Sequence, residues 1–197
     1  MQRYAELCCM TNFSFLEGAS HADELVVQAK ALGLAGLGVA DRNSLAGVVR
    51  AHKAAKQAGL PLLIGARLDL QDAPPLIAYP RDRAAYGRLS QLITLGRRRA
   101  ETGSCLLYLD DVLAAAQDTV LIVLADESMD SAALPKQLLR LKAVGCPKDL
   151  YLAASNLHRD DDDRRIARHA AIARALGLRL VAVNDVLMHS PTRRPLA

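Results

Sequence analysis

Side chains near the N-terminus have the chemistry of a metal site, but as a set they are incomplete. Cys8 and Met10 lie at the end of an apolar run, and Glu17 follows a few residues later. A thiolate or a carboxylate can ligate a metal ion, whereas the thioether of Met10 is a poor ligand for hard or borderline ions. Farther along, Arg42 and Arg67 cannot ligate, because a guanidinium keeps its proton and offers no lone pair. Residue chemistry alone therefore leaves Cys8 and Glu17 as the possible ligands among these five residues.

Other combinations of residues have less support. The acidic run Asp160–Asp163 could suggest a metal site, but it lies at a predicted helix start, where acidic side chains favour the positive end of the helix dipole. We therefore expect a solvated helix start rather than a metal site. No serine has a Gly-x-Ser-x-Gly context, and the sequence contains neither a Walker motif nor a G-x-G-x-x-G after a strand. A serine hydrolase and nucleotide binding through either motif are therefore disfavoured.

Apolar runs of strand length alternate with segments of helical period, which is typical of repeated βα units. The seven predicted strands are Tyr4–Cys9, Gly36–Ala40, Leu62–Leu68, Leu76–Tyr79, Val120–Leu124, Leu150–Ala154 and Arg179–Val183. Periodicity alone allows such units to close into a barrel or to form an open doubly wound sheet.

Five helices are predicted between these strands. In the first, Leu25, Ala29 and Leu32 form an apolar stripe, and Ser20 with Asp23 supplies a capping signal. The others are Ser44–Ala58, Asp82–Leu95, Ala132–Val144 and Asp161–Leu176, with Gly59, Gly145 and Gly177 as stop signals. The segment Gly96–Gly103 is predicted to be an exposed loop.

Length and composition predict one soluble domain. A chain of 197 residues that is 51% hydrophobic can bury a full core without disulfide bonds. Cysteines at positions 8, 9, 105 and 146 lack C-x-x-C spacing, which favours reduced thiols. The net charge of +4 permits nucleic-acid contact, but five Tyr, two Phe and no Trp provide few aromatic side chains on which bases could stack. We expect no membrane span and no secretory signal.

Two segments carry a family resemblance. TNFSFLEGASH at residues 11–21 and SLAGVVRAHKAAKQAGL at residues 44–60 resemble the polymerase and histidinol phosphatase (PHP) domain of bacterial C-family DNA polymerases, especially the error-prone branch. The resemblance implies an α/β fold, a distorted seven-stranded (β/α) barrel with metal ligands at the C-terminal ends of its strands. It also implies that residues 1–197 are a single PHP domain, the N-terminal fragment of a longer polymerase.

The resemblance places the metal positions on degenerate residues. Active members have His-x-His, Thr-Asp-His, Gly-x-Glu and Asn-Asp-Val-His at four places, and each motif is altered here. The corresponding positions are Cys8, Met10, Glu17, Asp41, Arg42, Arg67, Asp185 and Leu187. We expect no bound metal and no catalytic residue in this segment. His189 is more typical of a surface histidine, and His158 matches a later histidine of the family only loosely.

Arginines at the metal positions suggest a replacement. We expect Arg42 and Arg67 to neutralise Glu17, Asp41 and Asp185 through salt bridges, and the alternative is that both arginines point into solvent. A second group of arginines, Arg97, Arg98, Arg99, Arg193 and Arg194, could contact phosphate or another domain, or could be solvated.

The resemblance implies that the parent protein is a damage-induced, translesion DNA polymerase that uses Mg²⁺. This segment lacks the polymerase carboxylates, so we expect a structural or interaction role without proofreading. The alternatives are a metal-dependent phosphoesterase or 3′–5′ exonuclease, and a protein-binding module for mutasome proteins or a sliding clamp. Expected partners are the palm domain of the same chain and, through the parent enzyme, DNA. The expected location is the cytoplasm.

Overall fold

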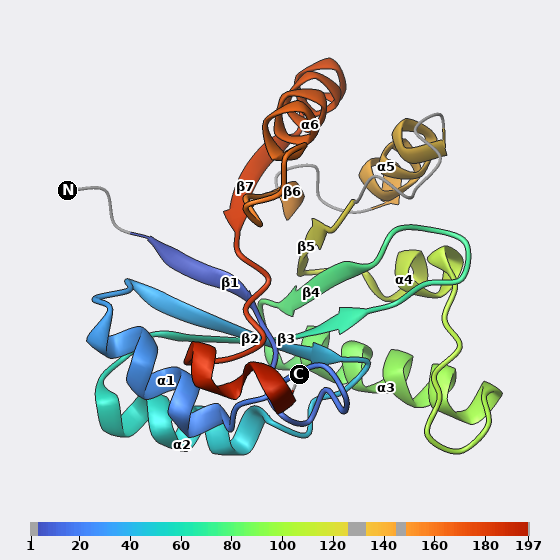
Figure 1. Cartoon of the computed structure of the whole chain (residues 1–197). Helices are drawn as coiled ribbons and strands as arrows, with labels where there is room; N and C mark the ends of the chain where they lie inside the picture. Colours follow the sequence, from blue (N-terminus) through green and yellow to red (C-terminus); the bar gives the residue numbers. More distant parts are fainter. Residues whose placement is uncertain (1–3, 126–132, 145–148, 197) are drawn as a thin grey trace. The chain divides into compact units, whose positions relative to one another are not determined.

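The computed structural model describes residues 4–125, 133–144 and 149–196 (Figure 1). The chain divides into two compact units. Unit 1 comprises Met1–Arg67 and Val183–Ala197, and unit 2 comprises Leu68–Ala182. The prediction of a single domain over residues 1–197 stays a prediction. None of the described helices is long and apolar enough to cross a membrane.

Seven strands are present in the described residues, and all seven predicted strands are confirmed within two residues at each end. They are β1 (Ala5–Cys9), β2 (Gly36–Arg42), β3 (Leu62–Leu68), β4 (Leu76–Pro80), β5 (Thr119–Val123), β6 (Leu150–Ser155) and β7 (Arg179–Val183). The helices are α1 (Ala22–Ala31), α2 (Val48–Ala58), α3 (Arg83–Arg99), α4 (Leu109–Ala115), α5 (Ala133–Val144), α6 (Asp162–Leu176) and the 3-10 helix η2 (Pro191–Leu196).

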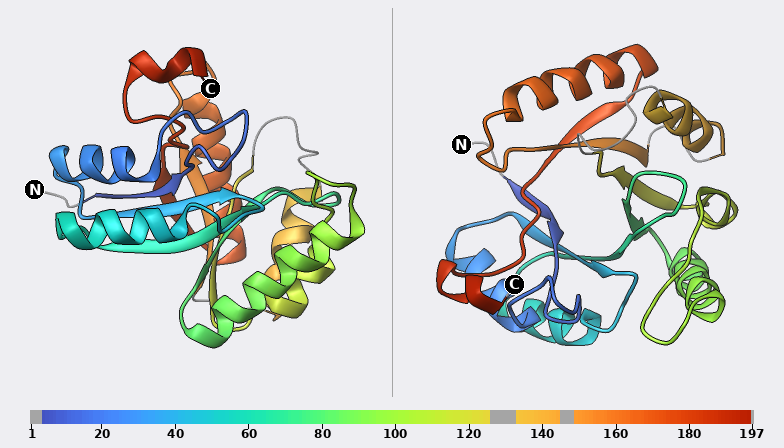
Figure 2. Two further views of the ribbon diagram at one scale, coloured as in Figure 1. Left: turned by 90° about the horizontal axis from the view of Figure 1, so that it is seen from below. Right: turned by 45° about the vertical axis from the view of Figure 1, so that its right-hand side comes forward.

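Unit 1 is built on the parallel strands β1, β2 and β3. The register between β2 and β3 pairs Leu37 with Leu62 and ends by pairing Arg42 with Arg67. Helices α1 and α2 contact each other and lie together beside these strands (Figures 1 and 2). Their apolar faces join the strands in one core, which comprises Cys9, Ala22, Leu25, Val26, Ala29, Leu37, Val39, Ala51, Ala55 and Leu60.

The C-terminal segment of the chain completes unit 1. Val186 forms a bridge with Cys9, in which Met10 N donates to Val186 O at 2.9 Å and Val186 N donates to Cys8 O at 2.7 Å. Figure 2 shows η2 beside α1, and Arg193 forms an ion pair there with Glu24. Residues almost 180 positions apart therefore share the same local structure.

Unit 2 contains the remaining strands, in the order β4-β5-β6-β7. Strand β5 is parallel to β6 but antiparallel to β4, so this unit departs from the predicted succession of βα repeats. In α6, Asp162 and Arg165 are buried and form an ion pair, and Arg165 also donates to Ser155. The prediction that Asp160–Asp163 is a solvated helix start is therefore wrong for Asp162.

The structure corrects three helix boundaries. Helix α2 begins at Val48 rather than Ser44, and α1 is capped by His21 with Glu24 rather than by Ser20 with Asp23. Helix α3 continues through Arg99, so the predicted loop at Gly96–Gly103 begins a full turn later. Helix α4 and η2 were not predicted. The expected helix residue Ala132, the stop signal Gly145 and the thiol of Cys146 lie outside the described residues.

The two described glycine stop signals are confirmed. Gly59 and Gly177 have φ of 61° and 62°, a left-handed backbone that glycine adopts without steric cost at a helix end. Cys8, Cys9 and Cys105 are free thiols, as predicted.

Candidate functional site

Asp41 is the centre of a buried hydrogen-bond network at the C-terminal end of β2. The residue is 1% exposed. Thr11 donates to its carboxylate through both its backbone N–H, at 2.7 Å, and its hydroxyl, and Ser14 Oγ donates at 2.9 Å. Ser14 Oγ in turn accepts from Arg42 N at 2.9 Å. The carboxylate thus ties the β1–α1 loop to the end of β2.

The absence of a side chain at Gly47 makes room for this network. A Cβ at this position would lie 2.4 Å from Asp41 Oδ2 and 2.8 Å from Thr11 Oγ1. The backbone N–H of Gly47 also hydrogen-bonds the carboxylate. Because Thr11, Ser14 and Gly47 come from two different loops, their convergence on Asp41 was not predicted from the sequence.

Burial raises the pKa of Asp41 above its usual value, and the hydrogen bonds from Thr11, Ser14 and Gly47 oppose that rise. The folded state therefore binds a proton more readily than the unfolded state, and this contribution to stability is lost as pH rises from about the unfolded pKa of 3.8 through the folded pKa. We expect the unfolding free energy of the protein, relative to that of the Asp41→Asn variant, to fall as the pH rises above the unfolded pKa of 3.8. Urea unfolding of both proteins as a function of pH measures the difference, and a constant difference would contradict the expectation.

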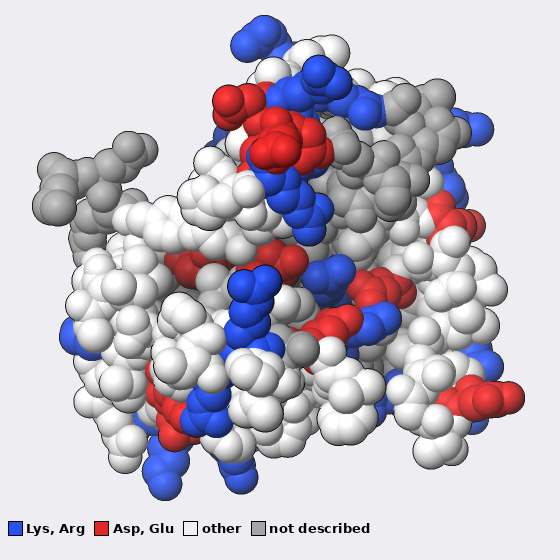
Figure 3. Space-filling view, in the orientation of Figure 1, with Lys and Arg blue, Asp and Glu red and all other residues white. Residues whose placement is uncertain are grey.

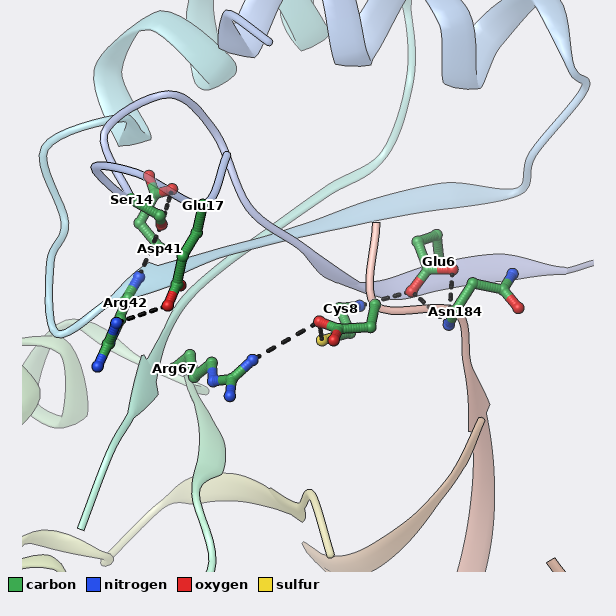
Figure 4. A network of polar contacts seen from close by, with 9 residues as sticks. Glu6, Cys8, Ser14, Glu17, Asp41, Arg42, Arg67 and Asn184 are labelled. Carbon is green, nitrogen blue, oxygen red and sulfur yellow. Dashed lines mark hydrogen bonds and ion pairs between the residues drawn. The ribbon is translucent and has the colours of Figure 1, made fainter. Parts of the chain in front are cut away.

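Arg42 and Arg67, which lie at positions where the family resemblance predicts metal ligands, both contact carboxylates (Figure 4). Arg42 Nη1 donates to Glu17 Oε1 at 2.5 Å, and Arg67 Nη1 lies 3.7 Å from Asp185 Oδ1. The side chains of Arg42 and Arg67 are 47% and 22% exposed. Partly exposed ion pairs of this kind contribute about 0–1 kcal/mol each, so their main effect is to neutralise charge.

Cys8 is buried beside Asp185. Its Sγ donates to Asp185 Oδ1 at 3.3 Å. Burial, together with the negative charge of Asp185, raises the pKa of the Cys8 thiol well above its usual value, and burial also raises the pKa of Cys9. The thiol is therefore the form present at neutral pH, and a thiol is a far weaker metal ligand than a thiolate.

The donor set does not fit the metal cluster of the family. Met10 is buried and offers only a thioether, and Leu187 offers no donor. Arg42 and Arg67 bring positive charge to within hydrogen-bond or ion-pair distance of the carboxylates of Glu17 and Asp185. Among the described residues, no group of three or more His, Cys, Asp or Glu side chains could hold a metal ion.

Glu6, which was not predicted from the sequence, is a buried carboxylate next to Cys8. It is 2% exposed, accepts from Cys8 N at 2.7 Å and from Tyr4 Oη at 2.8 Å, and also bonds the backbone N–H of Asn184 (Figure 4). Its carboxylate links β1 to the segment that follows β7. An acidic residue inside an otherwise apolar strand was the signal available in the sequence.

The remaining predicted residues lie elsewhere. His189 Nδ1 is 2.8 Å from Ser20 Oγ and 3.7 Å from Glu24 Oε2, and Arg193 also pairs with Glu24. Arg97, Arg98 and Arg99 occupy the last turn of α3, where Arg99 pairs with Asp111 at 2.5 Å. Arg194 and His158 are exposed. The alternative of a solvated tail does not hold for Arg193, and the expected phosphate or interdomain contacts of these five arginines stay a prediction.

Known proteins similar to this chain fall in two groups. The chain is 47% identical over 194 residues to error-prone DNA polymerase 1 of Agrobacterium fabrum and, again over 194 residues, 47% identical to an error-prone DNA polymerase of Caulobacter vibrioides. Each match covers 98% of this chain but only 18% of the relative, at its N-terminal region.

Solved structures share the fold at low sequence identity. One is described as a metal-dependent phosphoesterase from Bifidobacterium adolescentis, with a TM-score of 0.72, 18% identity, and coverage of 96% of this chain and 89% of that one. Another is an amidohydrolase from Chromobacterium violaceum, with a TM-score of 0.68, 16% identity, and coverage of 93% and 87%. These likenesses confirm the predicted α/β fold class, the seven-stranded barrel of the PHP type. The model of the PHP domain family matches residues 6–175, and the chain therefore belongs to the PHP domain family.

Proposed function

We propose that this chain is the N-terminal PHP domain of an error-prone, translesion DNA polymerase, and that its former metal site has a structural role. The observation that carries the second part is the pairing of Arg42 with Glu17 and of Arg67 with Asp185. Each arginine stands where the family pattern has a metal ligand. The first part is supported by the relatives, whose sequences match this chain over their N-terminal region.

Metal-dependent hydrolysis needs several ligands that hold ions close together and activate water. This chain supplies Glu17 and Asp185 at the metal positions, and both are already engaged by guanidinium groups. Proofreading or a phosphoesterase activity like that named for the Bifidobacterium protein would require these pairs to separate and new ligands to be found. The arrangement instead supports a domain stabilised without metal.

In the parent polymerase, nucleotide addition with Mg²⁺ would take place outside this segment. The proposed location is the cytoplasm. The proposed partners are the palm domain of the same chain, DNA, and mutasome or clamp proteins.

Metal dependence of stability tests the structural role. We expect the melting temperature of the protein to be the same with chelator and with added Mn²⁺ or Zn²⁺, because the site binds no metal. A metal ion that bound only the folded state would raise the melting temperature. Purified protein should also contain less than about 0.1 equivalent of metal. Stoichiometric metal together with a melt that falls on chelation would contradict the proposal.

Two charge-reversal variants, one at the site and one as a control, extend this experiment. In Arg67→Glu, a new carboxylate faces Asp185, so we expect a lower melting temperature that added Mn²⁺ partly restores. Arg81 pairs with Asp149 in unit 2, so Arg81→Glu is the matched control, and Mn²⁺ should leave its melt unchanged. Equal rescue of both variants would mean that the site has no special relation to metal ions.

A further inference from the structure

An exposed apolar tip is the most unusual surface feature of unit 1. Phe15 and Leu16, at the end of the β1–α1 loop, are 82% and 79% exposed, and nearby Phe13 is 38% exposed. These two phenylalanines are the only ones in the sequence, so the chain places none in its core. Single exposed apolar residues are common, but three within four positions form a patch that marks a binding surface.

The tip is held firmly by its own loop. Ser14 N donates to Thr11 O at 2.9 Å, Gly18 N donates to Ser14 O at 2.9 Å, and the loop closes where Asn12 N donates to Ser20 O at 2.8 Å. Beneath it, Ser14 Oγ is anchored on Asp41. Leu16 has φ of 62°, a left-handed conformation that costs a leucine energy and that this network maintains. A rigid apolar anchor loses little entropy when a partner covers it.

The charges around the tip favour a protein partner over nucleic acid. Glu17 directly follows Leu16 and pairs with Arg42, and Asp185 pairs with Arg67. On the face shown in Figure 3, blue and red side chains are interspersed. A phosphate backbone requires a stripe of positive charge, and a leucine is no platform for base stacking. Phenylalanine and leucine side by side are suited to an apolar pocket of a protein.

We infer that Phe15 and Leu16 dock into an apolar pocket formed by the part of the polymerase chain that lies outside this segment. This inference rests on the proposed function. The relatives show how much chain is available, because this segment accounts for 18% of their length. A patch that an isolated segment exposes is then buried within the longer protein. Docking of the tip thereby fixes the position of the PHP domain against the rest of the polymerase.

Hydroxyl-radical footprinting of a longer polymerase chain that begins with this segment tests the docking. After correction for intrinsic reactivity, we expect Phe15 to be modified several-fold more slowly than Tyr108, which is 40% exposed here. Modification of Phe15 faster than Tyr108, as its exposure in this structure dictates, would overturn the inference. Protection that appears only with added single-stranded DNA, or only at concentrations where the chain dimerises, would overturn it in favour of that occupant.

Substitution of the tip gives a second readout in the same longer chain. The double variant Phe15→Ala with Leu16→Ala should extend primers at least about tenfold more slowly and melt earlier, since buried apolar anchors dominate interfaces. The control is Val27→Ala with Val49→Ala, two side chains that are 63% and 78% exposed on helices of the same unit, and it should behave as the unsubstituted chain. Equal behaviour of the two double variants would contradict the docking.

These experiments distinguish a failure of the docking inference from a failure of the proposed polymerase function. Primer extension by the unsubstituted chain with Phe15 freely modified would remove only the docking inference. A protected Phe15 in a chain that extends no primer would remove the polymerase assignment and leave the contact standing.

Discussion

Replacing Asp41 by alanine is expected to lower the free energy of unfolding by about 3–5 kcal/mol, the cost of leaving several buried donors without an acceptor. The carboxylate accepts from Thr11 N at 2.7 Å, from the Thr11 hydroxyl, and from Ser14 Oγ at 2.9 Å. All three groups are buried, so water cannot readily take its place. Urea or thermal unfolding of both proteins measures the loss.

A control separates this effect from the loss of a negative charge. Asp23 is exposed in the first turn of α1, and Asp23→Ala should cost less than about 1 kcal/mol through the helix dipole alone. A loss below about 1 kcal/mol for Asp41→Ala would show that the network repacks or hydrates, and would remove the central role given to this carboxylate.

Gly18→Ala is expected to be the most damaging of the glycine substitutions in unit 1. A Cβ at Gly18 would lie 2.0 Å from Thr11 O, a backbone atom. Thr11 cannot move aside easily, because its N–H is bound to Asp41 and its carbonyl accepts from Ser14 N. We expect a loss of at least about 3 kcal/mol, together with a distorted loop tip. Thermal unfolding gives the first quantity, and the near-ultraviolet signal of the phenylalanines reports the second.

Gly87→Ala is the control substitution, at a position that has room for a side chain. Nothing lies within 4 Å of a Cβ built on Gly87, which is inside α3. Alanine in a helix interior is favoured over glycine by about 1 kcal/mol, so this variant should be more stable than the parent. If Gly18→Ala is tolerated as well as Gly87→Ala, the loop is much more plastic than its hydrogen bonds imply.

The sequence predicted the strands well because their signals are local. Several apolar runs are bounded by glycine, proline or charge, and β3 and β7 match residue for residue. Helix ends were less predictable. Gly96 was predicted to begin an exposed loop, but it lies inside α3, and a Cβ there would meet Cys105 Sγ at 2.6 Å and Leu107, so this glycine serves packing. Ser20 was read as a cap, yet its hydroxyl is 2.8 Å from Nδ1 of His189, a partner far along the chain.

The candidate site was likewise predictable from the sequence only in part. The degenerate positions could be named from sequence motifs, and the contacts of Arg42 with Glu17 and of Arg67 with Asp185 lie among the combinations considered. The roles of Thr11, Ser14 and Gly47 around Asp41 could not be predicted. They depend on a loop geometry that brings residues 30 positions apart within 3 Å, and single-sequence patterns do not encode such geometry.

The two-segment construction of unit 1 sets an order for its folding during synthesis. Met10 and Ala19 donate backbone hydrogen bonds to Val186 and Leu187, so the first strand and its loop lack their partners until nearly the whole segment has been made. At a translation rate of about 5–20 residues per second, the wait lasts roughly ten to thirty seconds. During that interval, the apolar residues of β1 and the tip at Phe15 and Leu16 are both uncovered. This early N-terminal region is therefore the part of the nascent chain most in need of chaperone protection.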